Sequence, residues 1–257
     1  MTALNHAARD SATMLRRNLR HALRYPAMTF TGLITPVLIM LLFVGVFGRA
    51  LGAGIPGGGR YVDYIAPGII VMGVTSGCMA TSVAVCVDMT EGVTDRFRTM
   101  PIARVSLLTG HVAAGVIQTM ASTVLVVAAA LALGFRPGAG VAGWLGAAGL
   151  LVLLAFALTW FAVALGLVAK TPEAASNSPM TVQFLPFLGS AIVPTATMPA
   201  GVRWFAEYQP FTPINEALRA LLAGHSPGTD GIVSLAWCGG VALGGYLWSK
   251  RLFNRVP

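Results

Sequence analysis

Charge is scarce in this chain. Of its 257 residues 10% are charged and 56% are hydrophobic, whereas a soluble domain usually carries about 25% charged residues. So few charges cannot cover the surface of a water-soluble protein of this length, which excludes a soluble enzyme or binding module. Intrinsic disorder is excluded as well, because disordered chains are polar and highly charged. The composition is that of a membrane protein with several spans.

Motifs that would support catalysis or nucleotide binding are also missing. The chain has no G-x-x-x-x-G-K-[ST] loop to hold ATP phosphates, no H-E-x-x-H and no C-x-x-C. The three cysteines are odd in number, lie in apolar runs and have no metal-ligand spacing, so we expect core residues: Cys78, Cys86 and Cys238. Of the four isolated histidines, His111 is expected to be a packing or interfacial residue. We therefore expect no catalytic residue, cofactor site or metal site on this chain.

Six charge-free stretches are long enough for a membrane helix, which needs about 20 residues. They predict one all-α transmembrane domain over residues 1–257 with spans near 28–48, 65–87, 106–134, 141–169, 179–197 and 231–249. Glycine pairs in two of them, Gly73/Gly77 and Gly240/Gly244, permit close helix packing. None of the six contains Asp, Glu, Lys or Arg, which disfavours a proton-coupled transporter or an intramembrane hydrolase. If the chain moves a substrate uphill, the energy would therefore enter through another subunit.

The fifth stretch is the least regular, because four prolines punctuate it: Pro179, Pro186, Pro194 and Pro199. Interior prolines remove backbone hydrogen bonds and kink a helix. In a membrane this is tolerated where protein or water satisfies the freed groups. We expect a bent fifth helix that packs inside the bundle or lines a cavity.

Basic residues are distributed unevenly between the segments that join the spans. With the N-terminus inside, the inner segments hold twelve Lys or Arg and the outer segments five, so the positive-inside rule predicts cytoplasmic termini. This placement fits topology better than a nucleic-acid patch. Residues 4–24 predict an amphipathic helix on the inner membrane surface, with a basic side formed by Arg9, Arg16, Arg17, Arg20 and Arg24.

The inner segment 88–104 has balanced charge and a short apolar stripe. Val93, Phe97 and Met100 follow helical spacing up to Pro101. Such a helix suits docking onto a soluble partner. The alternative is a solvated loop whose arginines only set topology, and the pattern alone favours it at least as much.

The outer segment 198–225 combines aromatic residues with a helix. Trp204, Phe205, Tyr208 and Phe211 predict an aromatic cluster at the membrane boundary. Thr212 is placed to cap a following helix, which Gly224 ends. Its apolar face is formed by Ile214, Ala217, Leu218, Leu221 and Leu222. We expect two short helices in the outer interface or outer leaflet; a simple repacked loop is the alternative.

These segments resemble the ABC-type-2 transporter permeases, and most closely the daunorubicin-resistance type. R-Y-P at 24–26 precedes span one, and T-P at 35–36 lies inside it. The inner loop matches the family's E-G-x(n)-P-x-x-R pattern at Glu91, Gly92, Pro101 and Arg104. It differs in two residue pairs, because the family often has G-T and two leucines where this chain has Gly92-Val93 and Arg96-Phe97. The most specific part is P-T-A-T-M-P at 194–199, F-A-E-Y-Q-P-F-T-P at 205–213 and E-A-L-R-A-L-L-A-G at 216–224.

The resemblance implies an exporter of amphipathic drugs, lipids or polysaccharides in the bacterial cell membrane. Two permease chains, identical or related, would sit above two P-loop ATPase subunits that carry ATP and Mg²⁺. The inner-surface helix and the inner loop would contact the ATPase, the loop through Glu91, Gly92, Val93, Arg96, Phe97, Arg98, Met100, Pro101 and Arg104. The outer segment would form a gate from Pro194, Met198, Pro199, Trp204, Phe205, Tyr208, Pro210, Phe211, Pro213, Glu216 and Arg219. A non-transporting membrane scaffold and a membrane enzyme are the competing hypotheses, the second disfavoured by the missing polar groups.

Overall fold

The computed structural model describes residues 26–48, 60–90 and 104–255, with side chains from 34–48, 60–90 and 108–253. Every regular element in these ranges is helical, as predicted. The long helices are α2 (Pro26–Gly45), α4 (Tyr61–Thr90), α6 (Arg104–Ala132), α7 (Val141–Val168) and α12 (Gly228–Arg255). The short ones are α8 (Pro172–Asn177), α9 (Met180–Phe184), η1 (Leu185–Leu188), η2 (Thr195–Thr197), α10 (Ala200–Tyr208) and α11 (Phe211–Leu222).

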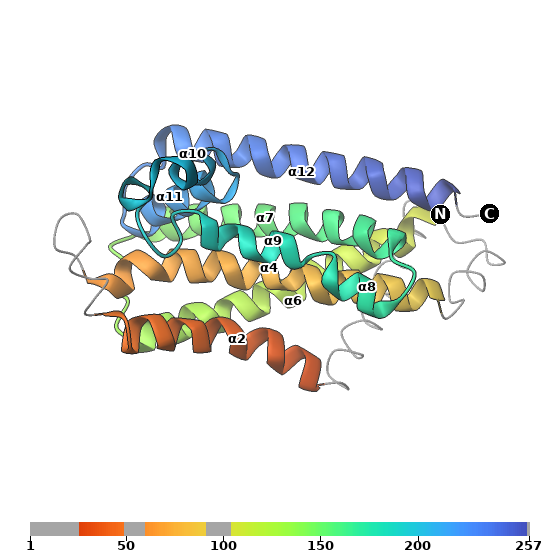
Figure 1. Cartoon of the computed structure of the whole chain (residues 1–257), viewed down its shortest axis with the longest axis horizontal. Helices are drawn as coiled ribbons and strands as arrows, with labels where there is room; N and C mark the ends of the chain where they lie inside the picture. Colours follow the sequence, from red (N-terminus) through yellow and green to blue (C-terminus); the bar gives the residue numbers. More distant parts are fainter. Residues whose placement is uncertain (1–25, 49–59, 91–103, 256–257) are drawn as a thin grey trace.

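The long helices lie side by side in an elongated bundle (Figure 1). Helices α10 and α11 gather at one end, here called the α11 end, and α8 lies at the opposite end, the α8 end. Helices α2 and α6 run toward the α11 end, whereas α4, α7 and α12 run away from it. Helix α2 is shorter than the other long helices and begins partway along the bundle, whereas α12 continues to the α8 end (Figure 1).

Four of the described helices are long and apolar enough to cross a membrane: α4, α7, residues Leu108–Ala132 of α6 and Gly228–Phe253 of α12. They coincide with the second, fourth, third and sixth predicted spans. Helix α2 overlaps the first and contributes a shorter apolar stretch, Ile34–Gly45. The chain is thus a helical membrane protein, and the full count of six spans remains a prediction.

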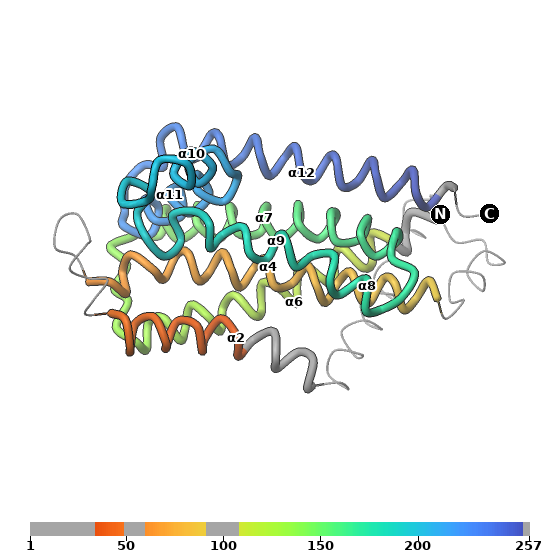
Figure 2. The backbone as a smooth tube through the Cα atoms, in the orientation of Figure 1, coloured from red at the N-terminus to blue at the C-terminus, as the bar shows by residue number. Residues whose placement is uncertain are grey.

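The fifth predicted span, 179–197, is not the single bent helix that we expected. It is divided into α9 and η1, a non-helical stretch over 189–194, and η2. Proline explains the breaks, because Pro179 and Pro186 cannot donate a backbone hydrogen bond and Pro194 lies where η2 begins. The divided segment nevertheless runs along the bundle from the α8 end to the α11 end (Figure 2).

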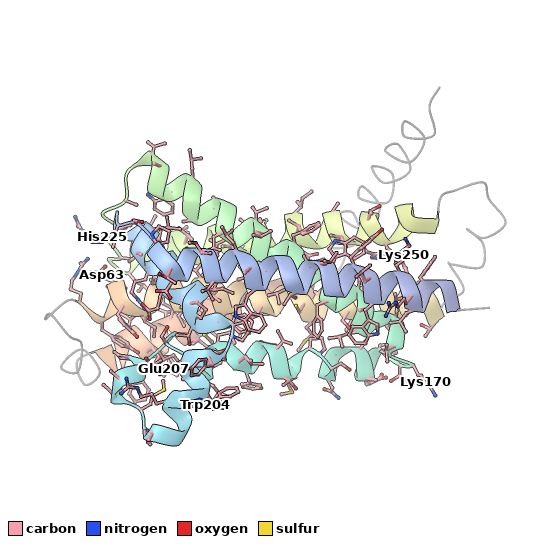
Figure 3. All side chains as sticks on the ribbon, turned by 90° about the horizontal axis from the view of Figure 1, so that it is seen from above. Asp63, Lys170, Trp204, Glu207, His225 and Lys250 are labelled. Atoms are coloured by element: carbon pink, nitrogen blue, oxygen red, sulfur yellow. The ribbon has the colours of Figure 1, made fainter. Side chains whose placement is uncertain are left out.

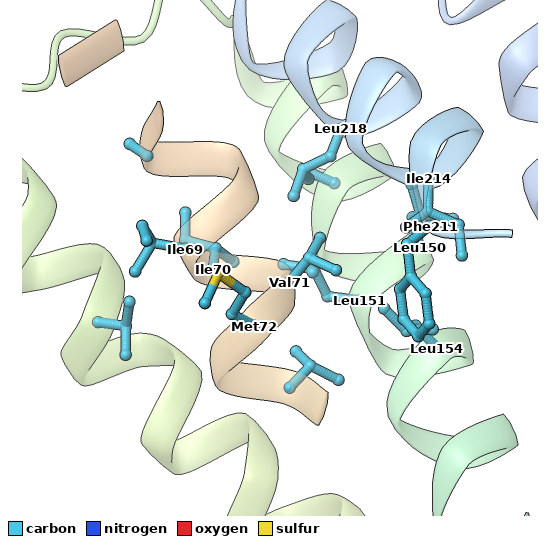
Figure 4. Close-up of a cluster of buried hydrophobic side chains, with 14 of the residues drawn as sticks. Ile69, Ile70, Val71, Met72, Leu150, Leu151, Leu154, Phe211, Ile214 and Leu218 are labelled. Carbon is cyan, nitrogen blue, oxygen red and sulfur yellow. The ribbon is translucent and has the colours of Figure 1, made fainter. Parts of the chain in front are cut away.

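Helix α7 lies at the centre of the bundle and packs against α4, α6, α11 and α12. The main apolar core forms where α4, α7 and α11 meet (Figure 4). Its buried side chains include Ile69, Ile70, Val71 and Met72 of α4, Leu150, Leu151 and Leu154 of α7, and Phe211, Ile214 and Leu218 of α11. This core joins the α11 end firmly to two of the long helices.

Close helix contacts depend on glycine, although not at both predicted pairs. Gly77 of α4 faces Thr119 of α6 so closely that a methyl group there would overlap the threonine, in agreement with the Gly73/Gly77 prediction. Gly240 and Gly244 of α12 face open space instead. The close contact of α12 is at Gly245, where a Cβ would lie 2.8 Å from the backbone nitrogen of Phe161 in α7. The glycine that lets α12 approach the α7 backbone is therefore Gly245, directly after Gly244 of the predicted pair.

We predict that Gly245→Ala destabilises the protein, whereas Gly244→Ala does not. The added methyl group at 245 would press on the α7 backbone, which cannot yield as a side chain can, and overpacking typically costs about 1–3 kcal/mol. At 244 the methyl group meets no atom within 4 Å, and alanine favours a helix by about 1 kcal/mol over glycine. Melting temperatures of the detergent-purified variants measure the difference. Equal melting of the two would show that α12 is not held by this contact.

Candidate functional site

The candidate site lies at the α11 end and is centred on Arg219 of α11. Its guanidinium donates to two backbone carbonyls, that of Ser190 at 3.0 Å and that of Tyr64 at 3.2 Å. It also pairs with Glu216 at 2.7 Å and lies over the Tyr64 ring, 3.9 Å from the centroid. Hydrogen bonds from a charged donor and a cation–π contact are both stronger than neutral contacts when largely removed from water. One side chain thus joins α11, the start of α4 and the stretch that follows η1.

Two tyrosines of α4 also bind this stretch. The Tyr64 hydroxyl donates to the Ser190 carbonyl at 3.0 Å, and the Tyr61 hydroxyl donates to that of Ile192 at 3.3 Å. Between them, a Cβ on Gly68 would overlap the Ala191 backbone. Residues 61, 64 and 68 follow helical spacing, so one face of α4 binds residues 190–192 by their backbone.

Thr212 performs a different task from the one predicted. Helix α11 begins at Phe211 with no side-chain cap, so the capping prediction is wrong. The Thr212 hydroxyl donates to the Ala206 carbonyl at 2.5 Å and accepts from the Gln209 amide at 3.2 Å and the Ser190 backbone at 3.4 Å. It therefore ties α10 and the 190–192 stretch to α11.

The C-terminal end of α11 lies just before Gly224, as predicted. Gly224 has a φ of +82°, the left-handed conformation that commonly ends a helix, and its backbone N–H donates to the Leu221 carbonyl at 3.1 Å. The predicted apolar face is inward: Ile214, Ala217, Leu218 and Leu222 are buried, and Leu221 packs against the core. The segment forms the short helices α10 and α11 rather than an irregular loop, and their place at the outer interface stays a prediction.

The interior of this junction is polar. Asn215 is fully buried on the α11 face shared by Thr212 and Arg219, and neither polar atom of its amide has a hydrogen-bond partner among the described residues. The buried Ser190 hydroxyl is likewise unpartnered there. Each such group costs about 1–3 kcal/mol. Residues 190–192 are therefore held by directed polar contacts and lie beside polar groups that no described residue satisfies.

The predicted aromatic cluster is divided between surface and core. Trp204, Phe205 and Tyr208 of α10 are exposed, and the Trp204 and Tyr208 rings touch with centroids 5.6 Å apart. Phe211 is buried in the main core instead, because it already belongs to α11. Three exposed aromatic rings at one end of an apolar bundle are typical of a membrane boundary.

The remaining residues of the predicted outer segment mark where its elements begin. Pro194 directly precedes η2, Pro199 precedes α10, and Pro210 precedes α11, while Pro213 lies in the first turn of α11. Met198 directly follows η2. Proline is favoured at such positions because its fixed φ suits a helix start and its missing N–H would be unpaired there anyway.

The opposite end contains a buried polar pair that the sequence did not reveal. We placed Asp88 beyond the second span and assigned His111 to packing, but α4 continues to Thr90 and buries the carboxylate. His111 Nε2 of α6 lies 3.0 Å from Asp88 Oδ2. No periodic signal links the two residues, because a connection between helices separates them in the chain. The structure alone brings them together.

The predicted ATPase contacts lie outside the described residues. This holds for residues 91–101 and for the basic side of 4–24. Arg104 is the first residue of α6, but its side chain is not described. These assignments stay predictions.

The chain also contains the letters of a serine-nucleophile motif, G-H-S-P-G at 224–228. That motif requires a turn from a strand into a helix, whereas here it joins α11 to α12. The Ser226 hydroxyl accepts a hydrogen bond from the Gly228 backbone at 3.4 Å. Within the described ranges no three His, Cys, Asp or Glu residues could share a metal ion.

We predict that Arg219→Ala destabilises the α11 end, whereas Arg203→Ala changes little. Arg219 has 18% of its side chain exposed and binds two carbonyls, and losing charged hydrogen bonds of this kind costs about 1.5–3 kcal/mol. Arg203 pairs with Glu207 at the surface with about half its side chain exposed, where a pair contributes less than about 1 kcal/mol. Melting temperatures report the first effect. Thiol labelling of a cysteine at position 193 should also become faster in Arg219→Ala only; an unchanged rate would mean that Arg219 does not hold this stretch.

Comparison with known proteins agrees with this architecture. The family model of the ABC-2 type transporter matches residues 10–223, which include α2 through α11. The daunorubicin resistance ABC transporter permease protein DrrB1 of Streptomyces coeruleorubidus is 29% identical over 233 residues, covering 90% of this chain and 81% of that protein. The family match extends over the divided segment and the Arg219 contacts as well as α2, α4, α6 and α7. The chain therefore belongs to the ABC-2 type transporter family.

Proposed function

We propose that this chain is the permease subunit of an ATP-driven exporter in the bacterial cell membrane. The observation that carries the proposal is the family match over residues 10–223, on a bundle with four helices long and apolar enough to span a membrane. The sequence has no phosphate-binding loop, so ATP and Mg²⁺ would bind a separate P-loop ATPase. A second permease chain, identical or related, would complete the translocation path.

The α8 end is proposed to face the cytoplasm. Lys170 and Lys250 lie at that end (Figure 3), and Arg251 follows directly. Positive charge is retained on the cytoplasmic side of membrane proteins. The aromatic side chains of α10 and the Arg219 contacts would then lie outside. Both chain termini would be cytoplasmic, as the uneven distribution of basic residues predicts.

Cysteine labelling tests this orientation. In a chain whose three native cysteines are replaced by alanine, Thr229→Cys should react with a membrane-impermeant thiol reagent added to intact cells. Asn177→Cys should react only after the cells are opened. Both positions are exposed and lie at opposite ends of the bundle, so each is the control for the other. The reverse pattern would overturn the orientation.

The α11 end is proposed to act as the outer gate. Residues 190–192 are held through backbone carbonyls by Arg219, Tyr64 and Tyr61, so the contact can open without exposing much apolar surface. The apolar interior between the two charged ends suits an amphipathic drug, lipid or glycoconjugate. The name of the DrrB1 relative supports a drug, which makes daunorubicin the natural first probe.

The inner loop is proposed to dock onto the ATPase. Phe97→Ala should weaken co-purification with a P-loop ATPase encoded beside this chain, because apolar anchors supply most docking energy. Glu91→Lys should leave assembly nearly intact and lower transport per ATP hydrolysed, since rim charges mainly orient partners. Neither change should alter membrane insertion. If both variants assemble and transport like the parent, the loop is a topogenic linker.

The decisive experiment is co-purification of the full chain with that ATPase, followed by ATP hydrolysis in vesicles with and without daunorubicin. Hydrolysis that depends on the permease supports the proposal. A chain that binds no ATPase would instead act as a membrane scaffold. Hydrolysis stimulated by the permease but not by daunorubicin would leave the permease role standing and exclude this drug as substrate.

A further inference from the structure

We propose that the Asp88–His111 pair is a positioning element that fixes the two helix ends from which the coupling loop extends. The inference deepens the proposed function and rests on docking of an ATPase at residues 91–103. Asp88 lies in the last turn of α4, before that loop, and His111 lies in the second turn of α6, after it. A contact between them therefore closes the base of the loop.

The two side chains form a close polar contact that is shielded from water. His111 Nε2 lies 3.0 Å from Asp88 Oδ2, and the two side chains are 6% and 11% exposed. Shielding from water strengthens a polar contact of this kind. It fixes both the distance between the two helices and their rotation, because each side chain is short and buried.

A small second core joins four long helices near the pair, since its residues on α4 and α6 lie within one turn of Asp88 and His111 in the chain. Val85 of α4, Leu108 and Val112 of α6, and Trp160 and Val163 of α7 form it, and Tyr246 of α12 packs against it. Trp160 and Tyr246 meet edge to face with centroids 5.0 Å apart, and the Ser249 hydroxyl donates to the Trp160 carbonyl at 3.3 Å. A displacement of the pair would consequently be passed to α7 and α12 as well as to α4 and α6.

Simple helix packing does not require this pair. Elsewhere α4 and α6 meet through small residues, as at Gly77 with Thr119 and Gly115 with Thr81. A buried carboxylate–imidazole contact is usually no more stabilising than apolar packing of the same volume, and its advantage is specificity of arrangement. Its position at the base of the one loop with the family's E-G-x(n)-P-x-x-R pattern points to a role in transmitting force.

The test uses alanine variants, which remove the polar contact, and variants that keep a polar group in its place. Asp88→Ala and His111→Ala remove the contact; Asp88→Asn and His111→Gln retain an acceptor or a donor at the same reach. Thr123→Ala is the matched control, since this buried threonine of α6 donates only to the Thr119 carbonyl of its own helix. Each full-length variant is co-purified with the ATPase. ATP hydrolysis per bound ATPase is then compared with that of the ATPase alone, a readout that needs no substrate.

The alanine variants should retain the ATPase but lose at least about fivefold of the permease-dependent hydrolysis, the lower limit of common coupling between sites. The double alanine variant should lose no more than either single one, because the two residues act as a unit. Asp88→Asn, His111→Gln and Thr123→Ala should stay close to the parent.

Three results separate the possibilities. A parent chain that binds no ATPase refutes the proposed function itself. A parent that binds and stimulates the ATPase, with alanine variants that do the same, refutes only the positioning role. If hydrolysis falls in step with melting temperature across all five single variants, the pair is merely structural and the inference is overturned.

Discussion

Close approach of helix backbones is the constraint on which the rest of this structure depends. Lipid is as apolar as the side chains that face it, so helices in a membrane associate through tight packing and a few polar contacts. Gly245 lets α12 lie against the α7 backbone, and Gly68 does the same for α4 and Ala191. Helix α7 is enclosed by α4, α6, α11 and α12, so the centre of the bundle is continuously packed.

Different kinds of polar contact hold the two ends of the bundle together. At the α11 end, Arg219 and two tyrosines hold a proline-broken stretch by its carbonyl oxygens, so that contact depends on backbone geometry. At the α8 end, Asp88 and His111 join two regular helices through side chains. A proposed gate and a proposed coupling base thus lie at opposite ends of one packed unit, as an ATP-driven transporter requires.

The divided fifth segment connects these ends. A continuous helix over 179–197 would satisfy its own backbone and would need nothing from α4. Prolines break it, and the carbonyls of Ser190 and Ile192 are satisfied by tyrosine hydroxyls and a guanidinium instead. The irregular backbone is tolerated because protein surrounds it. Exchange of these partners would change the conformation of the stretch without unfolding a helix.

Composition and pattern alone determined the class of this protein. Scarce charge and long uncharged runs predicted an all-helical membrane protein and its four longest spans. Turn residues and apolar periodicity predicted helix α11 from Ile214 to its end just before Gly224. Each of these features follows from the local sequence. Tertiary structure decided how the fifth segment is broken. It determined that Thr212 binds the 190–192 stretch rather than capping a helix, and that α12 contacts the α7 backbone at Gly245 instead of Gly244. It also decided that Asp88 meets His111 and that Arg219 meets Tyr64. Such contacts depend on how helices rotate and slide against one another, which is set by packing among residues far apart in the chain.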